Sequence, residues 1–91
     1  MSNVYRRKLT VCEVERHFVY VESEYRDMFP DANRFFTLFV DSKKIQVKID
    51  NKKRVWAYLL FGAIPSLKAG NAITFQKKGK GEFNVSIDRY I

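Results

Sequence analysis

The chain has 91 residues, a length that suits one domain, so we expect a single domain over residues 1–91. Hydrophobic residues make up 46% of the chain and aromatic residues 15%, which supports a modest core and argues against disorder. The apolar runs are too short to span a bilayer, and no signal peptide is recognisable at the first residues. We therefore expect an intracellular protein with no membrane association.

The formal net charge of +7 is unevenly distributed along the chain. Residues 1–50 carry nine Lys/Arg against eight Asp/Glu, whereas residues 51–91 carry eight against two. A domain whose excess positive charge lies in one half has a directional field, which suits a polyanion. We expect nucleic acid as the partner. A membrane surface fits less well because no basic amphipathic helix is present.

Catalytic and metal chemistry find little support in the sequence. With one cysteine, Cys12, and one histidine, His17, the chain has neither an internal disulfide nor a Cys/His metal site. Gly79 and Gly81 lack the strand–loop–helix context of a phosphate-binding loop. No pair of ionisable residues has a recognisable catalytic spacing. We expect no enzyme activity, no cofactor, no metal and no small-molecule substrate.

Apolar residues alternating with polar ones dominate the pattern and predict strands with one buried face. In chain order, the predicted elements are a strand at 18–21, a short helix at 23–29 that Ser23 caps, strands at 35–40 and 45–49, a helix at 56–64, and strands at 73–76 and 83–88. The strand at 35–40 is denser in apolar residues, so we expect it to be more buried than the alternating strands. Polar turns at 41–44, 51–54 and 77–81 connect neighbouring strands or lead into the second helix.

Three segments occur in a suggestive order. The first runs from Leu9 to Val21 and continues through 25–30 to a Phe-Pro pair; the second is the strand pair at 36–49; the third contains Tyr58-Leu59-Leu60-Phe61, Leu67-Lys68-Ala69-Gly70-Asn71 and the closing strand. Together they resemble the B3 DNA-binding domain of plant transcription factors and of the recognition domains of some bacterial restriction endonucleases. The sequence departs from the family at Tyr58, often Trp there, at Asn71, usually Asp, and at Cys12-Glu13, commonly Ser-Asp.

The resemblance implies a mainly β fold, a seven-stranded open pseudobarrel with two short helices. It implies that Tyr58 plugs the barrel as the family's Trp does. It also implies two arms that grip the major groove: an N-arm at 10–17, between the first two strands, and a C-arm at 50–56, between the fourth and fifth. The compartment would be the cytoplasm or nucleoid in a prokaryote and the nucleus in a plant.

Candidate DNA contacts follow from the arms and from basic clusters, because Lys and Arg neutralise phosphates while Arg, Asn and Glu can also read base edges. They are Thr10, Glu13, Arg16 and His17 in the N-arm; Asn51, Lys52, Lys53, Arg54 and Trp56 in the C-arm; Arg6, Arg7 and Lys8 before the first strand; and Lys77, Lys78 and Lys80 at a hairpin tip. Each has a plainer alternative: a solvated turn, an Arg16–Glu13 surface pair, a polar rim position for His17, a core position for Trp56, or a frayed basic terminus.

We therefore expect sequence-specific binding of double-stranded DNA by a recognition module of a regulatory or restriction system, acting with a nuclease or regulatory partner domain. One alternative is an OB-like barrel for single-stranded DNA or RNA, which needs aromatic side chains on a wet strand face. Most aromatics in this chain alternate inward, with Tyr5, Tyr20 and Tyr90 as candidates for exposure. Another is a basic protein-interaction module with an acidic partner.

Overall fold

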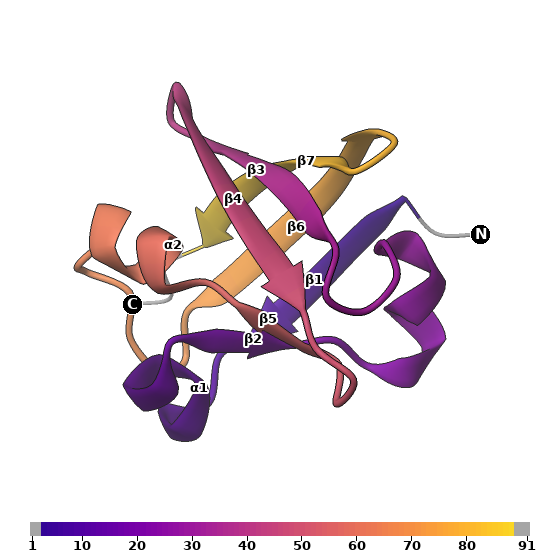
Figure 1. Ribbon diagram of the computed structural model, residues 1–91. Helices are drawn as coiled ribbons and strands as arrows, with labels where there is room; N and C mark the ends of the chain where they lie inside the picture. Colours follow the sequence, from indigo (N-terminus) through magenta and orange to yellow (C-terminus); the bar gives the residue numbers. More distant parts are fainter. Residues whose placement is uncertain (1–2, 89–91) are drawn as a thin grey trace.

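The computed structural model describes residues 3–88, so Tyr90 lies outside the described residues. Its strands form one seven-stranded sheet in the order β1-β6-β7-β3-β4-β5-β2, and the sheet curls into a nearly closed barrel (Figure 1). The strands are β1 (Val4–Lys8), β2 (Phe18–Tyr20), β3 (Phe35–Val40), β4 (Lys43–Ile49), β5 (Arg54–Trp56), β6 (Ala72–Gly79) and β7 (Glu82–Asp88). The predicted mainly β barrel is confirmed.

Three short helices connect the strands: α1 (Val11–Arg16), the 3-10 helix η1 (Ser23–Met28) and α2 (Tyr58–Ala63). Helices near η1 and α2 were expected. The prediction for η1 was wrong in one detail, because its N-cap is Glu22 and no side chain caps it. Helix α1 was not expected, since that segment was assigned to an arm loop.

Strand pairing follows the alternation of the sequence. Neighbouring strands are antiparallel except β3 and β7, which run parallel. In β4, Ile45, Val47 and Ile49 are buried while the residues between them are exposed. Strand β3 also alternates, and Phe35 is 63% exposed. Beyond Phe35, the residues between the buried ones are partly buried in β3 but exposed in β4, which confirms the prediction that β3 is the more buried of the two strands.

The barrel interior is filled by aromatic and branched side chains. Phe29, which follows η1, stacks on Phe83 with ring centroids 4.8 Å apart and meets Phe36 and Phe75 edge-on at 5.7 and 5.6 Å. These four rings are buried. Such aromatic packing adds to the area they bury, so Phe29 fixes η1 against the barrel.

Helix α2 packs on the barrel with a different face from the one that the family resemblance implied. Leu60 and Phe61 are buried, together with Ala57 before the helix and Ile64 after it, whereas Tyr58 is 62% exposed. The prediction that Tyr58 plugs the barrel was therefore wrong. The apolar segment offers two helical faces of the same spacing, and the structure buries the one that begins at Ala57.

Candidate nucleic-acid interface

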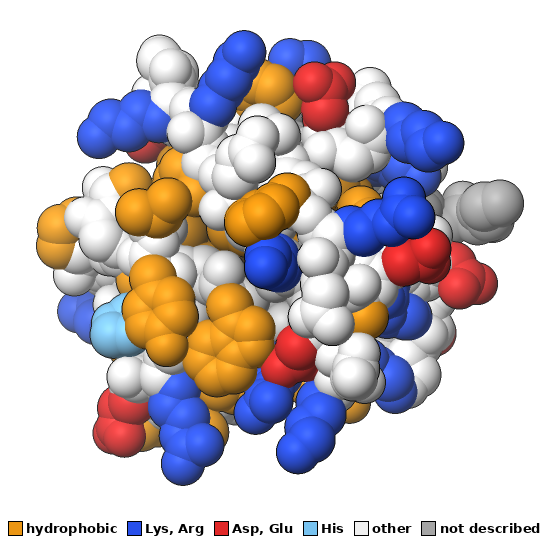
Figure 2. Space-filling model, viewed as in Figure 1, with side chains coloured by type: hydrophobic (Ala, Val, Ile, Leu, Met, Phe, Trp, Pro, Cys, Tyr) orange, Lys and Arg blue, Asp and Glu red, His pale blue; other side chains and the backbone are white. Residues whose placement is uncertain are grey.

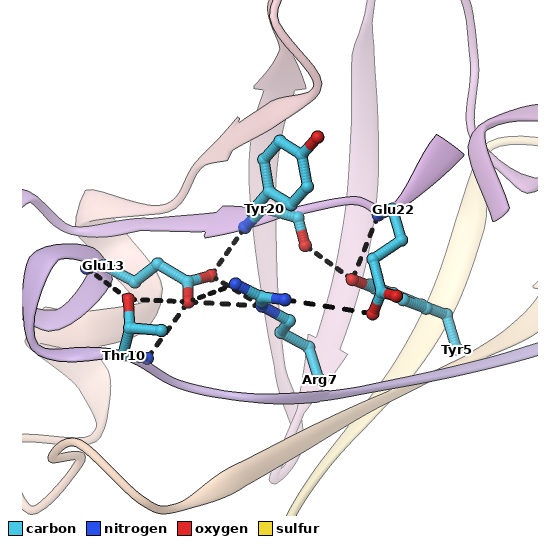
Figure 3. Close-up of polar contacts among 6 residues, drawn as sticks. All are labelled: Tyr5, Arg7, Thr10, Glu13, Tyr20 and Glu22. Carbon is cyan, nitrogen blue, oxygen red and sulfur yellow. Dashed lines mark hydrogen bonds and ion pairs between the residues drawn. The ribbon is translucent and has the colours of Figure 1, made fainter. Parts of the chain in front are cut away.

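The open seam of the barrel, between the edge strands β1 and β2, is joined by side chains. The buried Tyr5 donates a hydrogen bond from its hydroxyl to the carbonyl of Tyr20 at 2.6 Å and accepts one from the N–H of Glu22 at 3.2 Å. Burial raises the pKa of Tyr5 to about 12, so the hydroxyl keeps its proton at neutral pH. Tyr5 is fully buried, so the suggestion that it could be exposed was wrong (Figure 3).

Glu13 completes this seam from α1. Its carboxylate accepts hydrogen bonds from the N–H of Tyr20 at 2.7 Å, from Arg7 at 3.0 Å, and from the N–H and hydroxyl of Thr10, both at 3.0 Å (Figure 3). Arg7 also reaches the carboxylate of Glu22, 3.8 Å away. Burial lowers the pKa of Arg7, but the hydrogen bond and charge of Glu13 outweigh it and raise that pKa. One carboxylate thus caps α1 and ties it to both edge strands.

Three candidate DNA contacts therefore belong to the hydrogen-bond network at the seam. Glu13 is 2% exposed, so the prediction that it reads a cytosine was wrong: its carboxylate is buried and already accepts from four donors. Thr10 and Arg7 supply their polar groups to the same network. The prediction that Arg6, Arg7 and Lys8 precede the first strand was also wrong, because all three lie within β1.

The N-arm is therefore a capped helix and not a loop. Thr10 and Glu13 form a capping box, in which the Thr10 hydroxyl accepts from the N–H of Glu13. The helix ends at His17, whose left-handed backbone (φ 64°) turns the chain into β2. Arg16 is exposed in the last turn, and the His17 ring lies against Tyr58 and Phe61, with centroids 5.5 and 5.4 Å away.

The β4–β5 turn, which is the predicted C-arm, is built around Asp50. Its carboxylate accepts from the N–H groups of Lys52 and Arg54, each at 2.9 Å, from the Arg54 side chain at 2.8 Å and from the Trp56 indole N–H at 2.9 Å. Burial raises the pKa of Asp50, but these hydrogen bonds outweigh it and hold that pKa below its usual value. The turn is thus held in one conformation by Asp50, which was not among the candidate site residues.

The candidate contacts of this turn differ in their exposure and in the bonds that their side chains already make. Asn51 and Lys52 are exposed. Lys53 adopts a left-handed backbone (φ 64°) and donates from its ammonium group to the Ser23 hydroxyl. Arg54 is bound to Asp50 and lies over the rings of Phe18 and Trp56, 5.8 and 5.0 Å from their centroids. Asn51 and Lys52 are thus the residues of this turn best placed to meet a ligand.

Between the two arms lies the outer face of β2 and β5, which is aromatic. Phe18 pairs with Trp56, and Tyr20 pairs with Arg54, in the antiparallel register. Val19 and Val55 point into the barrel, so the residues beside them point outward. Trp56 is partly exposed and lies in β5, so its alternative assignment to the core at a helix start was wrong.

The arms lie on one side of the molecule and the two hairpin tips on another. In Figure 1, α1 and the β4–β5 turn both lie at the bottom, joined by β2 and β5, whereas the β3–β4 and β6–β7 hairpins point upward. Figure 2 shows two large hydrophobic side chains beside the chain's one histidine on the lower part of this face, with Lys and Arg side chains along the edge below them.

The remaining candidate cations are divided between the β6–β7 hairpin and β1. Lys77, Lys78 and Lys80 are exposed in the β6–β7 hairpin. The ammonium group of Lys78 lies 4.0 Å from the centroid of Phe39, and Lys77 and Lys80 line a groove that also contains Asp27 and Asp31. Arg6 pairs with Asp88 at 3.1 Å, and Lys8 is exposed at the end of β1. Nearby acids therefore offset part of the charge at the groove and at Arg6.

Within residues 3–88, no group of three or more His, Cys, Asp or Glu side chains is arranged to hold a metal ion. Across the same residues, no helix has the length and apolar character needed to cross a membrane.

Comparison with known proteins supports the fold from structure and not from sequence. No family model matches the chain, and no curated protein matches it. A hypothetical protein of Arabidopsis thaliana has a similar structure, with a TM-score of 0.68 and 16% identity over 92% of this chain and 87% of that one. The N-terminal domain of LlaJI.R1 from Helicobacter pylori gives a TM-score of 0.76 and 11% identity over 94% and 80%. Both neighbours are B3-like, so the chain has a B3-like pseudobarrel fold.

Proposed function

We propose that this chain binds double-stranded DNA sequence-specifically, with α1 and the β4–β5 turn as two arms in the major groove. The observation that carries the proposal is the joint placement of the arms. Both lie on one side of a B3-like barrel, and each presents an exposed cation, Arg16 on α1 and Lys52 on the turn. Phosphate contacts by such cations position a protein on DNA, and base contacts specify the site.

The separation of the arms suits the groove. The β2–β5 ladder that joins them is three residue pairs long. At about 3.3 Å per step, its first and last pairs lie roughly 7 Å apart, which fits within the width of about 12 Å of the major groove. Asn51 and Arg16 are the exposed arm residues that can form two hydrogen bonds with one base, adenine and guanine respectively. These two side chains are our candidates for base reading.

The proposal also covers the kind of system in which the chain acts. It serves as the recognition module of a regulatory or restriction system and acts with a nuclease or regulatory partner domain, without cutting DNA itself. The B3-like fold of both structural neighbours supports this assignment. Incubation of the isolated chain with duplex DNA and Mg²⁺ should leave the DNA intact, and reproducible cleavage that co-purifies with the chain would contradict the assignment.

Binding of a single strand is the second candidate, and a specific observation favours it. Register pairs place Phe35, Lys48, Trp56 and Phe18 in one row across four strands of the sheet. Lys48 lies 4.5 Å from the Phe35 ring centroid, and Phe35 and Trp56 are the rings of this row that reach solvent, since Phe18 is buried. The expectation that the aromatics mostly point inward therefore underestimated this face. Aromatic platforms of this kind stack on unpaired bases.

Competition between probes separates the candidates. A labelled duplex chosen from a randomised pool is displaced by unlabelled duplex or by either of its strands, at several salt concentrations. Duplex binding through phosphates predicts displacement by duplex at far lower concentration than by either strand, and affinity that falls by orders of magnitude as salt is raised. Preferential displacement by a single strand would favour the second candidate. Affinity that barely changes with salt would favour a protein-interaction module.

A further inference from the structure

Two aromatic rings are stacked and open to solvent between the arms. The rings of Trp56 and Tyr58 are nearly parallel, with an interplanar angle of 14° and centroids 6.0 Å apart. Tyr58 is 62% exposed, although a residue of this size gains free energy from burial. Grouped exposed apolar side chains mark binding sites more often than single ones do. The contacts of Trp56 support the β4–β5 turn, but the core does not need the Tyr58 ring, which lies outside it.

The pair is held in place on both sides. The indole N–H of Trp56 donates to Asp50 at 2.9 Å, the Arg54 guanidinium lies 5.0 Å from its ring centroid, and the Phe18 ring is 5.2 Å away. Behind Tyr58, the His17 ring lies 5.5 Å away and itself meets the buried Phe61. A platform fixed before binding loses little side-chain entropy when a ligand stacks on it.

The surroundings specify the chemistry of the ligand. The C-terminal end of α1 supplies the exposed Arg16, and the β4–β5 turn supplies the exposed Lys52. The acid nearest to Trp56, Asp50, is already paired with Arg54 at 2.8 Å. A flat ring that carries a phosphate satisfies both features, because the ring stacks and the phosphate meets a cation. In intact duplex DNA the faces of the bases are covered by their neighbours, so a stacking site needs an unpaired base.

We propose that the Trp56–Tyr58 pair stacks on an unpaired base next to duplex DNA while the arms hold the duplex. The inference rests on the proposed duplex binding and extends it to a class of substrate: DNA with an extrahelical or unpaired nucleotide within the site. Tyr58, the more exposed ring, takes the base. Trp56 in β5 stacks on the other side of Tyr58, and its fluorescence reports the binding of the base.

The test uses the intrinsic fluorescence of Trp56, the single tryptophan of the chain. Three probes share one sequence: a perfect duplex, the same duplex with a one-nucleotide bulge, and the bulge-containing strand alone. The bulged duplex should bind about 5- to 100-fold more tightly than the perfect duplex, a range set by the contribution of one stacked base. It should also quench the fluorescence of Trp56 more strongly at saturation.

Variants of neighbouring exposed residues supply the controls. Tyr58→Ala should remove the preference for the bulge and leave perfect-duplex affinity within about twofold. Tyr58→Phe, which keeps the ring, should retain the preference. Leu59→Ala is the matched control, because Leu59 is 63% exposed on the same helix but has no ring, and it should leave all three affinities unchanged. Loss of the preference in Leu59→Ala, or its persistence in Tyr58→Ala, would overturn the stacking site.

The two proposals fail in different ways. Equal affinity and equal quenching with the bulged and perfect duplexes would overturn the stacking site and leave duplex binding intact. Tightest binding of the single strand would overturn the placement of the base beside a duplex. Absence of perfect-duplex binding even at low salt would overturn the proposed function itself, whatever the bulged probe does.

Discussion

At Glu13 one buried carboxylate holds together three parts of the chain: the start of α1, Arg7 in β1 and the N–H of Tyr20 in β2. Buried charges persist in proteins when they are paired and their remaining lone pairs are hydrogen-bonded, and both conditions hold here. The carboxylate replaces the ladder hydrogen bonds that full closure of the barrel between β1 and β2 would supply.

Replacing Glu13 with Gln should destabilise the fold by about 1–3 kcal/mol. The amide has nearly the same shape, but it leaves Arg7 without its closest countercharge and places a donor where acceptors are needed. Urea unfolding followed by circular dichroism measures the effect. Glu15→Gln is the control, since Glu15 is exposed on the same helix and should change stability by less than about 0.5 kcal/mol. Equal effects of the two variants on stability would contradict the role of Glu13 in joining the two edge strands.

Asp50 makes the stability of the C-arm depend on pH. Its pKa is lower in the folded protein than its ordinary value of 3.8, so the ionised carboxylate stabilises the fold. That contribution is fully present above the unfolded pKa and is lost as the pH falls through the folded pKa. Asp50→Asn should therefore be destabilising at pH 7, and its difference from the natural protein should shrink below about pH 4. A difference that stays constant over this range would contradict the argument.

At the scale of elements, α2 shows where sequence reasoning reaches its limit. Its segment is apolar almost all round, so two faces have the same helical spacing and periodicity cannot choose between them. Contact with β4 and the preceding residue Ala57 decides the choice in the structure. The resemblance to a family with Trp at this position favoured Tyr58, and the exposed Tyr58 shows that the favoured face was wrong.

A pair of substitutions tests the orientation of α2. Tyr58→Asp should leave the domain folded, with a change in stability below about 1 kcal/mol, because the new carboxylate stays in water. Leu60→Asp should unfold the domain, because Leu60 is fully buried and an unpaired charge cannot be accommodated there. Circular dichroism and thermal unfolding distinguish them. An unfolded Tyr58→Asp variant together with a stably folded Leu60→Asp variant would show that α2 buries the Tyr58 face instead.

The strands were more predictable than the site. Alternation at residues 45–49 located β4 and its buried face, because the period of two depends on local geometry alone. The Thr-x-x-Glu spacing of Thr10 and Glu13 also matches a capping box, which marks the start of a helix. It was missed because residues 10–17 were assigned to an arm loop. The seam and the role of Asp50 depend on which strands become neighbours in the fold. No local pattern carries that information, so the partners of these residues could not be predicted.

At the scale of the whole molecule, two clusters of candidate cations lie in separate regions of the fold. The arm side presents Arg16 and Lys52 with Lys53 beside them, and the β6–β7 hairpin presents Lys77, Lys78 and Lys80. A ligand that senses only charge would use both regions equally. A ligand read by the arms would not, because base edges are reached only by side chains that enter the groove.

The most direct measurement compares two triple variants with equal loss of charge: Arg16, Lys52 and Lys53 to Ala, and Lys77, Lys78 and Lys80 to Ala. Arg54 is left in place because it holds Asp50. Affinity for a selected duplex and for a random duplex is measured at one salt concentration, after unfolding curves show that both variants fold. The arm triple should reduce or abolish discrimination between the duplexes, at about 1–3 kcal/mol for each lost base contact, while the hairpin triple weakens both duplexes alike. Loss of discrimination in the hairpin triple, with discrimination intact in the arm triple, would contradict the account.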